Sequence, residues 1–75
     1  MTVNRGSAYR VIGYRPSVNS AWRQKLLTMG ILPGVTLEVV RVAPLGDPVQ
    51  IHTRRVSLAV RQRDLADIIL QEVVR

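Results

Sequence analysis

The side chains that most often carry catalysis or bind metals are few in this sequence and scattered along it. The 75 residues include no cysteine, one histidine (His52) and five carboxylates: Glu38, Asp47, Asp64, Asp67 and Glu72. A transition-metal site needs several such groups close together, and their spacing here matches no ligand motif. We therefore expect no metal site, and we expect His52 to be a solvent-facing strand residue, because it is out of phase with Val49 and Ile51.

Catalytic arrangements are equally hard to assemble from these residues. Asp47, His52 and Ser57 could be written as a hydrolytic triad, but nothing in the sequence marks a positioned base or an oxyanion site. A P-loop needs glycines followed by Gly-Lys-Ser/Thr, whereas the only lysine, Lys25, lies inside an expected helix. The five glycines form no GxGxxG pattern either. We predict a protein that is not an enzyme and binds no cofactor.

Arginine dominates the charge of the chain. Ten of the eleven basic residues are arginines, and with five acidic residues the formal net charge is +6, which favours an acidic partner. Arg54 and Arg55 precede the expected strand 56–60, and Arg61 and Arg63 follow it. We expect the two pairs to project near each other at one end of the fold. The simpler interpretation is a solvated charged rim, because exposed charge is common and contributes little to stability; the functional interpretation is a contact patch for an acidic partner.

Nucleic acid is a second class of acidic partner. Proteins that bind single strands add exposed aromatic side chains on which bases stack. This chain has no phenylalanine, and its three aromatic residues are Tyr9, Tyr14 and Trp22. We expect Trp22 and Tyr9 to be used in the core, so nucleic-acid binding is the alternative rather than the preferred function.

A short helix and a tight corner form the centre of the sequence. Residues 20–29 contain good helix formers, with Asn19 as the expected N-cap and Trp22, Leu26 and Met29 on one stripe at about 100° per residue. Leu27 points elsewhere, so an exposed Leu27 beside Arg23 could anchor a partner. Gly30 suits a helix end at positive φ, after which Ile31 would pack on Leu26. Pro33-Gly34 fits the centre of a type II turn.

Five short apolar segments separated by turn signals predict strands. They are residues 8–15, 35–43, 49–53, 56–60 and 68–74, with a proline-bounded loop at 44–48 that contains Gly46 and a helical turn at 61–67. In 35–43 the apolar parity switches after Val39, which indicates a bulge or a strong bend. The order of these elements predicts a mainly β fold, a small SH3-like barrel with one short helix after the first strand.

The chain has the length of one domain, so we expect residues 1–75 to form a single barrel, with residues 1–7 as a flexible N-terminus. Residues 1–10 lack the apolar segment and the small-residue cleavage site of a secretory signal, and no apolar run approaches the roughly 18 to 20 residues of a membrane span. We therefore expect a cytoplasmic protein.

Several motifs taken together closely resemble the FeoA family, small proteins of the bacterial ferrous-iron transport system. The resemblance covers residues 8–74 and is carried by Met29-Gly30, Ile31-Leu32-Pro33-Gly34, Pro44-Leu45-Gly46-Asp47-Pro48 and Leu58-Ala59-Val60-Arg61. It implies an SH3-like barrel without enzymatic activity that assists the permease FeoB, which carries a cytoplasmic GTP-binding domain. The shared motifs are turn and packing signals: Trp22, Leu26, Gly30, Pro33, Gly34 and Gly46.

Our hypothesis from the sequence is that the chain docks on the cytoplasmic part of FeoB and is recruited by it to the inner membrane, with self-association left open. The candidate contact residues are Arg23, Leu27, Arg54, Arg55, Arg61 and Arg63. A related barrel is appended to metalloregulators of the diphtheria-toxin-repressor type. A free-standing metal-sensing module is therefore a further alternative.

Overall fold

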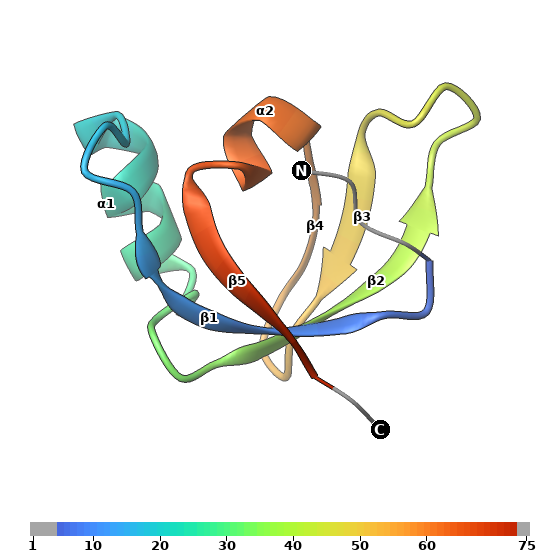
Figure 1. The fold of residues 1–75 in the computed structure, drawn as a ribbon, viewed down its shortest axis with the longest axis horizontal. Coiled ribbons are helices and arrows are strands. Elements are labelled where there is room, and N and C mark those ends of the chain that lie inside the picture. The colour runs from blue at the N-terminus through green and yellow to red at the C-terminus, as the bar shows by residue number, and fades with distance from the viewer. Residues whose placement is uncertain (1–4, 74–75) are drawn as a thin grey trace.

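The computed structural model describes residues 5–73, which form five strands and two short helices (Figure 1). In chain order these are β1 (Ala8–Tyr14), α1 (Ser20–Thr28), β2 (Thr36–Val42), β3 (Val49–His52), β4 (Ser57–Val60), α2 (Gln62–Leu65) and β5 (Ile68–Val73). Every element expected from the sequence is present, with ends that differ by at most two residues. Neither helix is long and apolar enough to cross a membrane within the described residues.

The strands form one antiparallel sheet in the order β4-β3-β2-β1-β5, which curls around its core. Two register shifts help it to bend, one between Val11 and Gly13 where β1 pairs with β5, the other between Val39 and Arg41 where β2 pairs with β3. The second shift confirms the irregularity expected from the parity switch. Val39 is 1% exposed, whereas Val40 is 42% exposed, on the outer face.

One apolar core lies inside the curl. Residues from all five strands, both helices and the α1–β2 connection contribute to it: Tyr9, Val11, Leu26, Ile31, Leu37, Val39, Val49, Ile51, Val60, Leu65 and Ile68. The expected helix stripe is confirmed, because Leu26 is fully buried and Trp22 and Met29 pack against the core from its edge. Trp22 Nε1 also donates a hydrogen bond to the carbonyl of Asp64, 3.1 Å away, which ties α1 to α2.

Helix α1 is capped at both ends as its sequence predicts. The Asn19 side chain accepts hydrogen bonds from the backbone N–H groups of Ala21 and Trp22. At the other end Gly30 has φ +79°, its N–H donates to Leu27 O and the N–H of Ile31 donates to Leu26 O. These two bonds and the left-handed glycine form a Schellman motif, which turns Ile31 into the core.

The Pro33-Gly34 turn then directs the chain into β2. Gly34 has φ +95° and the N–H of Val35 donates to Leu32 O, which agrees with the expected type II turn. Gly34 N–H donates to Val11 O and Val11 N–H donates to Val35 O, so the turn is fixed to β1. The corner therefore has one direction relative to the sheet.

Part of the expected flexible N-terminus lies outside the described residues, namely residues 1–4. The described part of that segment is held against β2, because Gly6 N–H donates to Val39 O and Val39 N–H donates to Ser7 O.

Candidate functional site

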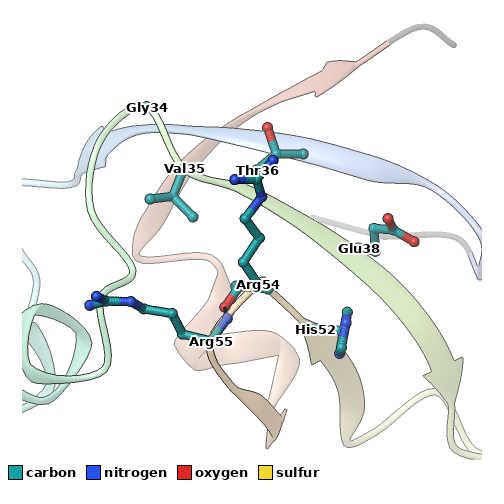
Figure 2. A pocket seen from close by; sticks show the side chains of 9 residues that line it. Gly34, Val35, Thr36, Glu38, His52, Arg54 and Arg55 are labelled. Carbon is teal, nitrogen blue, oxygen red and sulfur yellow. Dashed lines mark hydrogen bonds between the residues drawn. The ribbon is translucent and has the colours of Figure 1, made fainter.

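A pocket of about 620 Å³ opens between the α1–β2 connection and the turn that joins β3 to β4 (Figure 2). Its wall combines two glycines of the connection with polar residues of β2 and the β3–β4 turn. The lining residues are Gly30, Gly34, Val35, Thr36, Glu38, His52, Thr53, Arg54 and Arg55.

The β3–β4 turn is held by Thr53, a polar residue that is only 6% exposed. Its hydroxyl oxygen accepts from the backbone N–H groups of Arg55 and Val56, both at 3.2 Å, while its own N–H donates to Val56 O at 2.8 Å. This side-chain turn fixes the backbone of Arg54 and Arg55, whose own side chains stay exposed. Sequence reasoning missed Thr53, although a threonine before a charged pair between two strands is a turn signal.

The two guanidinium groups extend in different directions from this turn. The side chain of Arg55 runs to the α1–β2 connection, where a Cβ built on Gly30 would lie 3.7 Å from Arg55 Cδ. Arg55 thus approaches the C-terminal end of α1, whose carbonyls favour a cation. Arg54 extends along Thr36 (Figure 2). Within residues 5–73 no hydrogen bond or ion pair engages either guanidinium.

The remaining polar wall comes from the outer faces of β2 and β3. Glu38 and His52 are directly opposite each other in the β2–β3 ladder, and both point outward because Leu37 and Ile51 fill the core. The expectation of a solvent-facing His52 is confirmed. No group of three or more potential metal ligands occurs in the described part of the chain.

Arg23 and Leu27, the candidate contacts on α1, have different surroundings. The Arg23 guanidinium carbon lies 5.8 Å from the ring centroid of Tyr14, within the range of a cation–π contact. The Tyr14 hydroxyl donates to Ile31 O, and burial raises the pKa of Tyr14, while the positive charge of Arg23 acts in the opposite direction. Leu27 is half-buried and does not line the pocket, although its backbone carbonyl accepts a hydrogen bond from the N–H of the lining residue Gly30.

The expectation that the two arginine pairs share one end of the barrel is wrong. Arg54 and Arg55 lie before β4, whereas Arg61 and Arg63 lie after it, at the start of α2 (Figure 1). β4 is an extended strand of four residues, so about 13 Å of straight backbone separates the two ends. Of the two pairs, only Arg54 and Arg55 line the pocket.

The second pair has a structural carboxylate beside it that sequence reasoning also missed. Asp47, from the proline-bounded loop, accepts a 2.8 Å hydrogen bond from the backbone N–H of Gln62. Gln62 Nε2 donates in turn to Gly46 O at 2.9 Å. Gly46 has φ +88° and so permits this loop conformation.

The comparisons with known proteins agree with these features. The FeoA domain pattern matches residues 1–72, almost the whole chain. The chain belongs to the FeoA family. This family is linked to ferrous iron transport as a group of accessory proteins, as the sequence motifs indicated.

Several solved structures share its fold. An NMR structure of a Pseudomonas aeruginosa protein is 46% identical over 97% of each chain, with a TM-score of 0.73. A FeoA-like protein from Clostridium acetobutylicum is 33% identical, with 97% of this chain and 83% of that chain covered and a TM-score of 0.82. The FeoA of Stenotrophomonas maltophilia, described as an SH3 domain protein, has a TM-score of 0.79 at 17% identity, covering 93% and 85%. The predicted SH3-like barrel is confirmed.

Proposed function

We propose that this FeoA protein is a non-enzymatic accessory protein of ferrous iron uptake that docks on the cytoplasmic part of the permease FeoB. Membership of the FeoA family supports the link to ferrous iron transport. The Stenotrophomonas maltophilia FeoA is described as a possible activating factor of ferrous iron transport. The observation that carries the docking proposal is the concave surface at Arg54 and Arg55, two exposed cations held on a fixed turn.

The contact surface that we propose centres on this pocket and continues onto α1. Arg55 runs to the α1–β2 connection at Gly30, whose N–H donates to the backbone carbonyl of Leu27. We propose that the half-buried Leu27 adds apolar area to the surface next to the cations. Arg23 lies further along α1, beside Tyr14. Arg61 and Arg63 lie at the far end of β4, so they belong to a separate part of the surface.

Docking can change the permease without any chemistry on this chain. A bound protein that prefers one conformation of its partner shifts the partner toward that conformation. In FeoB the shifted element would be the GTP-binding domain or the gate of the pore. Cytoplasmic location and recruitment to the inner membrane follow from the same proposal.

A deletion strain and co-purification test the proposal together. We expect the strain without this chain to take up less ferrous iron and to recover when the chain is restored. We also expect the tagged chain to retain FeoB from solubilised membranes. Normal ferrous uptake in the deletion strain would contradict the proposal.

Two cheap measurements separate the alternatives. A nucleic-acid-binding protein would bind labelled RNA or DNA with an affinity that falls steeply with added salt. A metal-sensing module would show a higher melting temperature in the presence of Fe²⁺ or Zn²⁺, because a ligand that binds the native state stabilises it.

A further inference from the structure

We infer that the pocket between the α1–β2 connection and the β3–β4 turn binds an oxyanion group, a carboxylate or a phosphate, against the turn that carries Arg54 and Arg55. Neither a cofactor nor a metal is needed for this role. The inference rests on the shape of the pocket, on the chemistry of its unused polar groups and on the way the turn is held.

The turn presents the two cations in a defined way. The buried Thr53 hydroxyl accepts from two successive backbone N–H groups, those of Arg55 and Val56, which fixes the backbone that carries both arginines. Arg55 runs toward Gly30 and Arg54 along Thr36, so the two side chains bound one end of the pocket from two sides (Figure 2). Less backbone order is therefore lost on binding than in a mobile loop.

The polar groups that remain available at this end are donors. Both guanidinium groups lack a partner within residues 5–73, and the hydroxyl of Thr36 makes no hydrogen bond there either. Thr53 is already used by the turn, as described above. Guanidinium groups match the planar, two-oxygen edge of a carboxylate or phosphate, so the complementary ligand is an oxyanion.

One carboxylate, Glu38, also lines the pocket, and it fixes where the anion can sit. Glu38 lies on β2 opposite His52, whereas Arg54 and Arg55 lie beyond the end of β3. An anion is repelled from the Glu38 side and attracted to the arginine side, which places it against the turn and Thr36 rather than across the whole pocket.

The size of the pocket indicates what carries the oxyanion. About 620 Å³ is within the range of small-molecule sites, roughly 300–1,000 Å³, and exceeds what one carboxylate or phosphate occupies. The pocket therefore has room for a larger molecule that carries the group, either a docked partner with an acidic side chain or a phosphorylated solute. The choice between these sources rests on the proposed function, whereas oxyanion binding itself does not.

Titration of the isotope-labelled full chain with inorganic phosphate, followed by NMR, tests the site. Sodium chloride keeps the ionic strength constant. We expect saturable shifts at the amides of Gly30, Thr36, Arg54 and Arg55. The R54Q/R55Q variant should lose at least about tenfold in affinity, because it removes the positive charge and the guanidinium donors from the arginine side of the pocket.

The matched control is the R61Q/R63Q variant, which loses the same net charge at the other end of β4. We expect it to bind phosphate like the unmodified chain, and both variants to keep the wild-type melting temperature. Unsaturable shifts, or equal weakening in the two variants, would mean general attraction to a basic protein and would overturn the inference.

Two further arms distinguish the source of the anion and separate this inference from the proposed function. In the first arm, a glutamate-rich peptide competes with phosphate for the site. If it displaces phosphate, and if only R54Q/R55Q loses FeoB in co-purification, the anion is an acidic side chain of the partner. Phosphate binding with unchanged co-purification of R54Q/R55Q supports a solute. If the unmodified chain binds phosphate but retains no FeoB, the docking proposal fails and the site stands.

Discussion

The two ends of β4 carry the same sequence signal, a pair of arginines, in different surroundings. At the corner end, which comprises Gly30, Gly34, Arg54 and Arg55, the backbone is shaped by left-handed glycines and apolar packing, and the arginines face a pocket. At the loop end, which comprises Gly46, Asp47 and residues 61–63, the loop and α2 are joined by hydrogen bonds from Gln62 to Asp47 and Gly46.

The difference shows how structure decides what a charged pair can do. At the loop end a carboxylate that the fold needs lies beside the arginines, and it lowers the attraction for another anion. At the corner end the Thr53 hydroxyl, a neutral group, holds the turn, so the positive charge of Arg54 and Arg55 stays available. Four predictions probe this contrast between the corner end, where apolar packing and glycines shape the backbone, and the loop end, where hydrogen bonds hold it.

The largest effect is expected from Leu26→Ala, which removes apolar packing at the corner end. Leu26 is fully buried, and its carbonyl accepts from Ile31 N–H. The substitution should lower the free energy of unfolding by about 2–5 kcal/mol, because it leaves a cavity in the core. Urea unfolding measures it. The control Leu27→Ala, on the half-buried neighbour, should cost much less, and equal losses would contradict the assigned packing.

Gly30→Ala tests the backbone of the same end. Its φ of +79° is costly for any residue with a Cβ, whereas the space is adequate, because the nearest atom would be Arg55 Cδ at 3.7 Å. We expect a loss of about 1–2 kcal/mol in the free energy of unfolding. Gly13→Ala is the control, since Gly13 does not have a positive φ and an added Cβ meets nothing within 4 Å. Equal costs would contradict a conformational origin.

Asp47→Ala tests the loop end. It removes the acceptor for Gln62 N–H at the first turn of α2, a bond of the kind that caps helices. The expected loss is about 1 kcal/mol, typical of removing a capping side chain. Thermal or urea unfolding measures it, with Asp67→Ala as a carboxylate control of equal charge. No difference between the two variants would mean that Asp47 is not structural.

The smallest effect concerns Tyr14, which ties β1 to the corner through Ile31 O. Burial raises its pKa in the folded state above the ordinary value of 10.0. The folded state therefore holds the phenol proton more tightly than the unfolded chain does. This stabilising contribution is complete below that ordinary value, and it is lost as the pH rises through the raised pKa of the folded state.

Unfolding of the unmodified chain and of Tyr14→Phe, compared between about pH 9 and pH 11, isolates this contribution. We expect the free energy of unfolding to fall more with pH in the unmodified chain. Equal slopes in the two proteins would contradict the raised pKa.

Local sequence chemistry predicted the corner and the strands well. Asn19 at the helix start, Gly30 at its end and Pro33-Gly34 in the turn act through backbone preferences that extend over only a few residues, so they can be read without a fold. The irregularity after Val39 was equally visible, because strand residues alternate between two faces.

Contacts between distant segments could not be predicted in this way. The sequence does not show that Arg55 meets Gly30, that Asp47 holds the backbone of a residue fifteen positions later, or that the two arginine pairs point to opposite ends of β4. Those juxtapositions are set by strand register and by the curl of the sheet. The sequence alone determined a basic β protein of the FeoA type, with glycines at its tight turns. Only the tertiary structure decided which of its arginines share a pocket, because that depends on which ends of the strands the sheet brings together.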